Sequence, residues 1–349
     1  MTSRSRLLLL LTLFATVTLL AAPQAGYNVT KRATLGGEGF WDYLTVDSAA
    51  RRVYISRGTH VMVIDADSLK PVGDIPDTPG VHGIALAPEL GRGFTSNGQK
   101  NTVTIFDPKT LSKISEVSVG TAPDAIIYDP ASKRVFTFNA RSHDTTAVDA
   151  KSGAVAGTLA LGGKPEFAQP DEKGHMFVNI EDTGELVQFD TQKLTEMNRW
   201  KLAPCEEPSG LAFDKEHQRV FSVCGNKLMT VVDATNGKLI TTVPIGGGAD
   251  GVKFDSARRL VFASCGQSGT MVIVHEDSPA KFSAFATVET APGARTLALD
   301  PKTHDVYTVT AQVQPPPAAT PDNPRPRRTM VPGSFQVLVV GPGPAATSK

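Results

Sequence analysis

The sequence has little cysteine, no net charge and few signs of helix. Its 349 residues include 3 cysteines, too few for a disulfide-stapled scaffold. Lysine and arginine together number 35, as do aspartate and glutamate, so the formal charge is zero. Nucleic-acid binders gain much of their affinity by neutralising phosphates, so this balance makes a nucleic-acid partner, single-stranded DNA included, an unfavoured hypothesis. Long apolar stripes at the helical period are absent, which argues against a helical fold.

Several catalytic signatures are also missing. The sequence has no Gly-x-Ser-x-Gly nucleophile elbow, no phosphate-binding loop and no Cys-x-x-Cys-His haem attachment motif. Its 7 histidines are scattered rather than clustered at metal-ligand spacing. Function must therefore be sought in how residues from distant segments are brought together.

The first 25 residues have the pattern of a secretory signal peptide. Two arginines precede an apolar run over Leu7–Leu20, and small residues follow, with cleavage expected between Ala22 and Ala25. That run is too short to favour a permanent membrane span, and no later segment resembles one. We therefore expect an exported protein, periplasmic or secreted. In such an oxidising compartment, three cysteines predict one bridge and one free thiol.

After residue 26 the sequence repeats about every 42 residues. Each unit holds four short apolar runs separated by turn residues. The first run of each unit ends, 40 to 45 residues after the one before it, at Asp47, Ala87, Asp129, Asp171, Asp214, Asp255 and Asp300. Four strands per unit of this length are typical of a β-propeller blade, so seven units predict an all-β, seven-bladed propeller.

The last unit has no fourth run, but residues 27–37 match the missing one. We expect this N-terminal strand to complete blade seven and close the ring, giving a single monomeric domain over residues 27–341. Residues 342–349 are expected to form a disordered tail. A proline-rich insertion, residues 311–334, interrupts blade seven and is expected to be an extended flap.

Two segments, residues 77–107 and 162–190, carry a family resemblance most strongly. The repeat resembles that of the YVTN-type, YncE-like seven-bladed propellers of exported bacterial proteins, over essentially the whole chain after residue 26. The resemblance implies the propeller fold and a location outside the cytoplasm. It implies function only weakly, because proteins with this repeat include binding proteins, cofactor-associated proteins, lactonases and lyases.

The residue just before each first strand, here called the entry residue, is ionisable in six of seven units. The entry residues are Asp42, His82, Asp124, Glu166, Ser209, Asp250 and Arg295. Since first strands line a propeller's channel and begin on one face, these side chains should ring the channel mouth. Glu207 could add a further acid, and Trp41 could stack on a planar ligand. Tyr43 is expected to pack between blades.

This ring supports two hypotheses. In the leading one, the acidic mouth of the channel binds a small molecule or a protein partner, and no catalysis is required. In the alternative, Asp42, Asp124, Glu166 and Asp250 hold calcium or manganese in a metal-assisted hydrolase or lyase of lactonase or eliminase type. His82 would then move protons and Arg295 would stabilise an oxyanion. Because crowded carboxylates repel one another, at least one of them should have a raised pKa unless a cation or Arg295 compensates. The competing structural interpretation is that polar residues simply satisfy strand ends at a wet mouth.

Loops between second and third strands open on the same face and offer a second ring. In one of them, Arg141 and His143 could grip an anionic or polyhydroxylated ligand. The other members are Arg57, His60, Asn97, Ser142, Asp144, Asn179, Glu181, Asp182, Cys224, Asn226, Lys227 and Cys265. A Cys205–Cys224 bridge is the favoured pairing, with the state of Cys265 left open. The remaining histidines, His175, His217, His275 and His304, are expected in turns on the opposite face.

Overall fold

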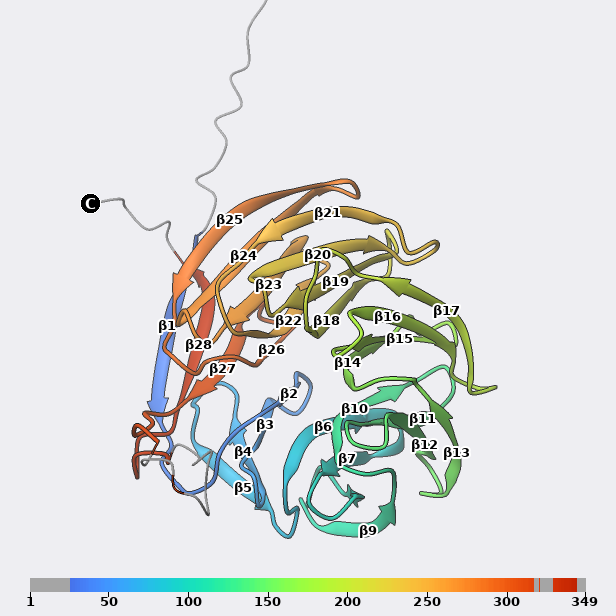
Figure 1. The fold of residues 1–349 in the computed structure, drawn as a ribbon. Coiled ribbons are helices and arrows are strands. Elements are labelled where there is room, and N and C mark those ends of the chain that lie inside the picture. Colours follow the sequence, from blue (N-terminus) through green and yellow to red (C-terminus); the bar gives the residue numbers. More distant parts are fainter. Residues whose placement is uncertain (1–25, 317–319, 321–328, 344–349) are drawn as a thin grey trace, which may run out of the picture.

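The computed structural model describes residues 26–316, 320 and 329–343. The expected signal peptide over residues 1–25, residues 317–319 and 321–328 of the proline-rich insertion, and residues 344–349 of the expected tail lie outside the described residues. Within the described part, seven four-stranded antiparallel sheets are arranged in a ring, as Figure 1 shows. The prediction of a seven-bladed propeller is therefore confirmed.

Each blade runs outward from its first strand. Blade one contains β2 (Leu44–Asp47), β3 (Arg52–Ser56), β4 (Val61–Asp65) and β5 (Pro71–Ile75). Blade two contains β6 (Val81–Ala87), the 3₁₀ turn η1 (Pro88–Leu90), β7 (Arg92–Asn97), β8 (Thr102–Phe106) and β9 (Lys113–Ser118). Blade three contains β10 (Pro123–Asp129), β11 (Arg134–Asn139), β12 (Asp144–Asp149) and β13 (Val155–Ala160). Blade four contains β14 (Pro165–Pro170), β15 (His175–Ile180), β16 (Glu185–Asp190) and β17 (Thr195–Lys201).

The other three blades repeat this order. Blade five contains β18 (Pro208–Asp214), β19 (Arg219–Cys224), β20 (Leu228–Asp233) and β21 (Leu239–Pro244). Blade six contains β22 (Ala249–Asp255), β23 (Leu260–Cys265), β24 (Thr270–Ser278) and β25 (Lys281–Glu289). Blade seven contains β26 (Leu297–Leu299), β27 (Val306–Thr310), β28 (Gln336–Gly343) and β1 (Gly26–Thr34).

Blade seven is closed by the N-terminal strand, as the repeat predicts. Strand β1 pairs antiparallel with β28, and Tyr27 lies opposite Pro342. The pairing extends to Gly343, opposite Gly26, so the first two residues of the expected tail belong to the sheet. Strand β28 has β27 on one side over Gln336–Val340 and β1 on the other side over its whole length, so segments from both ends of the chain are joined in this blade.

The core lies between blades, and one repeated aromatic position fills it. The third residue of the second-strand pattern is a phenylalanine or tyrosine in every blade, and each of these side chains is at most 1% exposed. They are Tyr54, Phe94, Phe136, Phe177, Phe221, Phe262 and Tyr307. Such rings bury large apolar areas between blades, so the strands carry apolar residues on both faces of each sheet. The fourth strands, by contrast, are largely exposed, as in β9.

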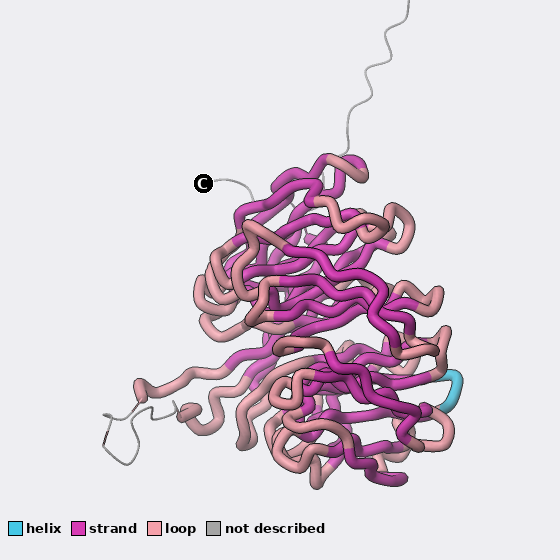
Figure 2. Tube along the Cα trace, turned by 45° about the vertical axis from the view of Figure 1, so that its right-hand side comes forward, coloured by secondary structure: helices cyan, strands magenta, loops and turns pink. Residues whose placement is uncertain are grey.

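The proline-rich insertion has an ordered base. Val313 and Met330 form an antiparallel bridge, and the Gln314 amide donates to the Thr329 carbonyl at 2.8 Å. The Val331 amide donates to the Gln312 carbonyl, also at 2.8 Å. Figure 2 shows these two loop segments leaving the ring side by side. The insertion therefore begins and ends as a short ladder rather than as two separate extended chains. No helix in the described part of the chain is long and apolar enough to cross a membrane.

Candidate functional site at the channel mouth

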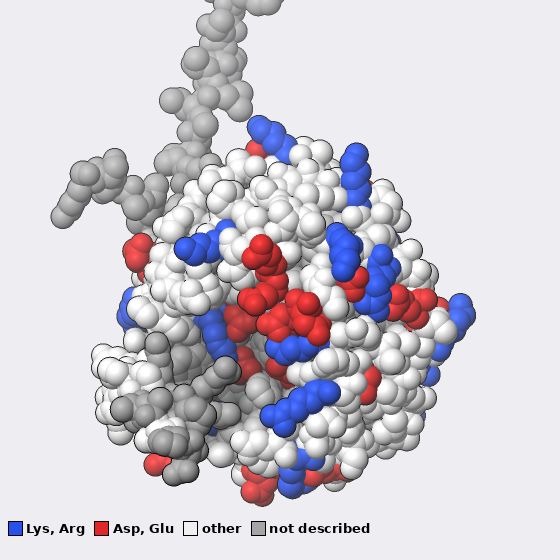
Figure 3. Space-filling model, in the orientation of Figure 1, with Lys and Arg blue, Asp and Glu red and all other residues white. Residues whose placement is uncertain are grey.

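The entry residues converge on one face of the ring. Figure 3 shows acidic and basic side chains gathered around the central hollow. In five blades the ladder between first and second strands is irregular just where the entry residue lies, as between Val81 and Ile84 or between Pro123 and Ile126. Such bulges redirect a side chain out of the regular alternation of a strand. They let the entry residues point into the mouth while the rest of the strand packs against its neighbours.

Five of the entry residues form a continuous chain of polar contacts. His82 Nδ1 lies 2.6 Å from Asp42 Oδ2, and the other Asp42 oxygen accepts from Arg295 Nη2 at 3.0 Å. Arg295 Nη1 then donates to Asp250 Oδ2 at 3.2 Å. Ser209 Oγ donates to the second Asp250 oxygen at 2.8 Å. The chain joins blades two, one, seven, six and five, so it exists only when the ring is closed.

The remaining two entry residues are less fully paired. Asp124 Oδ1 lies 3.5 Å from His82 Nδ1, and it is buried without accepting a hydrogen bond. Glu166 Oε1 lies 2.7 Å from Lys164 Nζ, and the same ammonium group contacts Glu181. Asp42, His82 and Asp124 each place one potential ligand atom within 4.8 Å of the others. This trio is the part of the mouth that could hold a cation.

Crowding and burial move the pKa values of the ring as the sequence predicts. Burial lowers the pKa of His82, but the hydrogen bond to Asp42 and the charges of Asp124 and Asp42 outweigh it and raise the pKa to about 9. Burial, followed by the charge of Asp42, raises the pKa of Asp124. Burial, followed by the charge of Asp124, raises the pKa of Glu166. At neutral pH His82 is therefore an imidazolium, and the ring is less acidic than its composition suggests.

Two aromatic side chains close the channel beneath the ring. Tyr43 of blade one and Phe167 of blade four meet across the axis, with ring centroids 5.2 Å apart. Tyr43 therefore packs against another blade, as expected, but the contact crosses the channel. Below them Lys253 Nζ lies 4.7 Å from the Phe167 centroid, and burial lowers the pKa of this lysine to about 8. A cavity of about 20 Å³ lies beside these residues. We call the space above this floor the cup.

The cup has two lobes that share Trp41 and Arg295. The first, of about 970 Å³, is lined by Glu207, Asp250 and Gln267 among others, and by residues 310–313 at the base of the insertion. The second, of about 930 Å³, is lined by Asp42, His82 and Arg141 among others. Trp41 is held in place between them by donating from Nε1 to the Gly293 carbonyl at 3.3 Å. The Trp41 indole also packs against the Phe335 ring, with ring centroids 5.9 Å apart.

Not all of the second ring reaches the cup. His143 is exposed and lines neither lobe, whereas Arg141 of the same turn lines the second. Arg57 is fully buried, donates to the carbonyls of Gly36, Glu38 and Gly39, and lies over the Phe335 ring. It fixes the segment before blade one and is not offered to a ligand. Asn97 and Asn179 are likewise buried in hydrogen bonds between strands.

Three residues of the site are not predicted by the sequence pattern. Lys164 lies two positions before an entry residue, Phe167 one position after the same residue, and Lys253 three positions after Asp250. A comparison of those positions across the repeat would have singled out Lys253, because the other units have smaller or uncharged residues there. Nothing in the repeat indicates that Phe167 faces Tyr43, since their blades lie on opposite sides of the ring.

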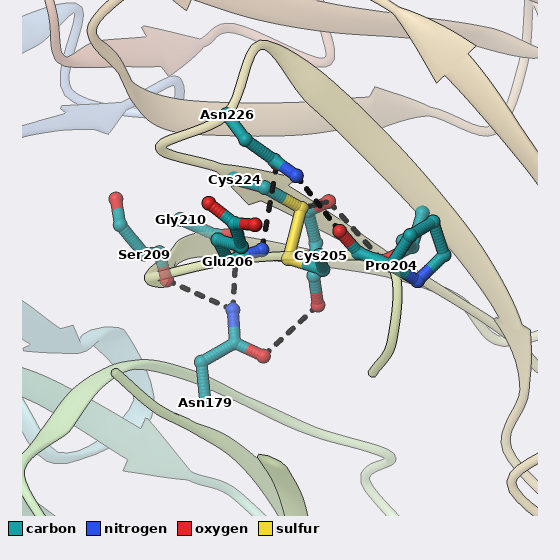
Figure 4. The surroundings of a disulfide bond; sticks show 10 residues. Asn179, Pro204, Cys205, Glu206, Ser209, Gly210, Cys224 and Asn226 are labelled. Carbon is teal, nitrogen blue, oxygen red and sulfur yellow. Dashed lines mark hydrogen bonds between the residues drawn. A yellow bond between two sulfur atoms is a disulfide. The ribbon is translucent and has the colours of Figure 1, made fainter. Parts of the chain in front are cut away.

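A disulfide anchors one wall of the mouth. Cys205 and Cys224 are joined with an S–S distance of 2.06 Å, and Figure 4 shows how the bond ties the segment before β18 to the end of β19. Asn226 reinforces this tie by donating to the Pro204 carbonyl at 2.8 Å. The anchored segment carries Glu207 and Ser209 into the first lobe. Cys265, the third cysteine, is free and buried, and burial raises the pKa of its thiol.

The fold is similar to that of proteins with little sequence in common with this chain. A chain in the crystal structure of the mitotic checkpoint complex has a TM-score of 0.73 at 12% identity, covering 98% of this chain and 100% of that one. A chain of Kuenenia stuttgartiensis hydrazine synthase has a TM-score of 0.67 at 15% identity, covering 86% and 97%. No family model and no curated protein matches the sequence. At these identities the likeness shows the propeller fold alone.

Proposed function

We propose that this chain is an exported propeller that binds a small polar molecule in the cup. The observation that carries the proposal is the buried Asp124 Oδ1, which accepts no hydrogen bond and lies 3.5 Å from Nδ1 of His82, a residue that lines the second lobe. An unpartnered buried carboxylate is costly, so a ligand that donates to it gains binding energy. The contact between Tyr43 and Phe167 beneath the mouth, with a cavity of only about 20 Å³ beside it, supports binding in the mouth over passage through the channel.

The arrangement of charges narrows the ligand class. Asp42, His82, Arg295 and Asp250 neutralise one another, which leaves Asp124 as the acceptor without a full partner. A hydroxyl or an ammonium group is the donor that suits it. Trp41 and the glycine-rich walls offer apolar contact for the body of such a molecule. An amine or a polyhydroxylated compound therefore fits better than an anion.

Export and kinship are part of the same proposal. The signal-peptide pattern of the first 25 residues supports a periplasmic or secreted location. The 42-residue repeat supports membership of the YVTN-type, YncE-like propellers. A protein in such a location would meet its small ligand in solution outside the cytoplasm.

Binding can be tested with three probes: putrescine as an amine, glucose as a polyol and acetate as an anion. We expect the amine or the polyol to raise Tm, and Asp124→Asn to weaken that binding at least tenfold in calorimetry. Asp129→Asn, in a turn on the opposite face, is the matched control and should leave the affinity unchanged. Mass spectrometry of small molecules released on denaturation covers ligands outside this set. Equal binding by both variants, or no released molecule and no Tm shift with any probe, would refute the proposal.

The second candidate is metal-assisted hydrolysis or elimination, and the trio Asp42, His82 and Asp124 favours it specifically. Two carboxylates and an imidazole within 4.8 Å suit calcium or manganese. Because the pKa of His82 is about 9, a metal must displace its proton, so affinity should increase as pH rises. Elemental analysis of protein purified without chelator, with melts in calcium and in manganese at pH 7 and pH 9, tests this candidate. No bound ion and no stabilisation at either pH would eliminate it.

A further inference from the structure

Blade six places a glutamate where the repeat has a small residue. In blades one, three, four and five the residue after the third-strand ending donates its amide to the turn that precedes the second strand, whereas in blade two this residue is Pro108, which has no amide hydrogen. Ala66, Ala150, Thr191 and Ala234 make this bond to the carbonyls of Arg51, Lys133, Gly174 and Gln218. Glu276 makes the same backbone bond, to the Arg259 carbonyl at 2.9 Å. The fold therefore needs only a small side chain at this position, and the carboxylate of Glu276 has some other reason to be there.

That carboxylate is buried and poorly satisfied. The Glu276 side chain is 0% exposed, yet neither of its oxygens accepts a hydrogen bond. The nearest cation is Arg259, whose Nε lies 3.6 Å from Oε2. Burial raises the pKa of Glu276, the expected response of a carboxylate without adequate partners. A group this costly marks a place where a ligand completes the structure.

Two side chains of blade five face the same point. His217 Nδ1 lies 3.4 Å from Glu276 Oε1 and 2.7 Å from Asp214 Oδ2. Asp214 is 2% exposed and His217 is 24% exposed, so the cluster is open to solvent only beside the imidazole. The three ligand atoms all lie within 4.8 Å of one another. Both blade-five residues belong to the turn between β18 and β19, on the face opposite the mouth.

We propose that Asp214, His217 and Glu276 form a binding site for one zinc-type divalent ion. An imidazole nitrogen and two carboxylate oxygens are borderline ligands that zinc accepts. Metal bonds of about 2.0–2.1 Å put tetrahedral ligand atoms about 3.3 Å apart, which matches the 3.4 Å between His217 Nδ1 and Glu276 Oε1 but exceeds the 2.7 Å hydrogen bond between His217 Nδ1 and Asp214 Oδ2. The exposed side of His217 leaves room for a water as fourth ligand. The site lies across the ring from the cup and is independent of the function proposed for the mouth.

Surrounding residues suit a metal site. Arg259 approaches Glu276 Oε2, which leaves Oε1 for the ion, and it offsets part of the carboxylate charge. Asp214 Oδ1 accepts the Glu216 amide at 3.0 Å, so its second oxygen is presented to the cluster. Such outer contacts orient metal ligands. In the metal-free protein His217 Nδ1 donates its proton to Asp214 Oδ2 at 2.7 Å, so an ion bound at Nδ1 would displace that proton.

The ion would clamp two blades at their longest hairpin. Strands β24 and β25 have 9 residues each, more than the third and fourth strands of blades one to five, and their tip extends beyond the ring. Arg219 of blade five already holds this tip by donating from Nε to the Pro279 carbonyl at 2.7 Å. A metal bridging Asp214 and His217 to Glu276 adds a second tie between the same blades.

The test uses the whole chain, stripped with chelator, dialysed and titrated with zinc chloride in a calorimeter. We expect one zinc ion per chain at this site and a rise in Tm of several degrees, with anomalous scattering at the zinc edge between blades five and six. Glu276→Ala, which restores the residue of Ala234 and Ala150, should abolish that site, as should His217→Ala. Asp124→Asn, which alters the mouth trio, should retain it.

The metal-free variants distinguish a metal site from a purely internal ion cluster. If zinc is the missing partner, metal-free Glu276→Ala should unfold at the same temperature as the metal-free wild type or higher, because an unsatisfied buried carboxylate has been removed. A clear fall in its Tm would mean that Glu276 serves Arg259 and His217 alone, and would overturn the proposal. So would zinc binding that persists unchanged in both Glu276→Ala and His217→Ala.

Discussion

The two faces of this propeller use the same residue types at the two ends of each first strand. On the face opposite the mouth, the terminal aspartates bond to the amides of their own turns: Asp171 accepts from Lys173 at 2.7 Å, and Asp300 accepts from Lys302 at 2.9 Å. At the mouth, the hydrogen-bond partners of Asp42 are His82 and Arg295, 40 and 253 residues away in sequence. The same carboxylate is a turn cap on one face and a member of a long-range network on the other.

The difference has an electrostatic consequence. On the opposite face, hydrogen bonds from Ser48, Arg51 and the Lys302 amide lower the pKa of Asp300, whereas burial and the charge of neighbouring carboxylates raise the pKa values of Asp124 and Glu166 at the mouth. The Asp300 turn is therefore stabilised by its own contacts, whereas the mouth carries unfavourable charge that a ligand could relieve, as Glu276 does at one point of the opposite face. Four experiments test the contrast between the Asp300 turn and the mouth.

The largest effect should come from the disulfide that anchors the mouth. Replacing Cys205 and Cys224 with serine should cost about 3 kcal/mol of unfolding free energy, since the bond closes a loop of 19 residues. Urea denaturation measures the loss, with fully reduced wild type as the control. Hydrogen exchange should accelerate at residues 206–209 and stay unchanged at residues 171–175. Equal acceleration in both segments would show that the bond stabilises the ring as a whole.

The next effect concerns the opposite face. Burial alone would raise the pKa of Asp300, but hydrogen bonds from Ser48, Arg51 and the Lys302 amide lower it to about 2. A lowered native pKa gives stability above the unfolded value near 3.8, and that stability is lost as pH falls toward 2. Asp300→Asn should therefore cost about 2 kcal/mol at pH 7 and little at pH 2. Urea titrations at both pH values decide this, and a loss that is independent of pH would contradict it.

At the mouth, Arg295 is the cation that separates two carboxylates. Arg295→Met should cost about 1.5 kcal/mol, less than a fully buried pair because the arginine side chain is 36% exposed. Asp250→Asn in the same chain should recover part of the loss, since one uncompensated charge is removed. Thermal melts of the two single variants and the double variant measure the coupling. Strict additivity would mean that Arg295 and Asp250 do not interact in solution.

The smallest effect is alkaline and has the opposite sign to that of Asp300. The native pKa of His82 is about 9, above the unfolded value of 6.5, so its contribution is complete below pH 6.5 and is lost as pH rises through 9. Because the imidazole is part exposed, we expect a fall of only about 1 kcal/mol between pH 6.5 and pH 9.5. In His82→Gln this fall should disappear from urea titrations. An identical slope in the variant would assign the alkaline loss to other groups.

The repeat was sufficient to predict the blades, the closing strand and the face on which each entry residue lies. Those predictions depend on spacing, and the aromatic position represented by Phe136 shows why spacing works: each blade must bury the same side chain against its neighbour. Tyr27 could be assigned to blade seven for the same reason.

Distances across the ring could not be predicted in this way. The Tyr43–Phe167 floor depends on the diameter of the channel, which no single repeat specifies. Arg57 looked like a loop residue open to ligands, but the segment before blade one folds over it and accepts its hydrogen bonds. Lys164 was not predicted because it lies two positions before the entry residue of its blade, although its side chain pairs with that residue, Glu166. The repeat predicts the position of a residue within its blade, but its contacts with other blades depend on the geometry of the closed ring.

The pairing of β1 with β28 also constrains the order in which the molecule can be built. Val29 lies opposite Val340, so the last sheet joins residues more than 300 positions apart. Blades one to six each consist of consecutive strands and can form as the chain emerges, but blade seven must wait for Gly343. Until then β1 has no partner, and the apolar sides of the first and sixth blades remain uncovered. Contacts this distant in sequence slow folding and prolong exposure to aggregation, so the closing step is where we expect this protein to depend most on chaperones.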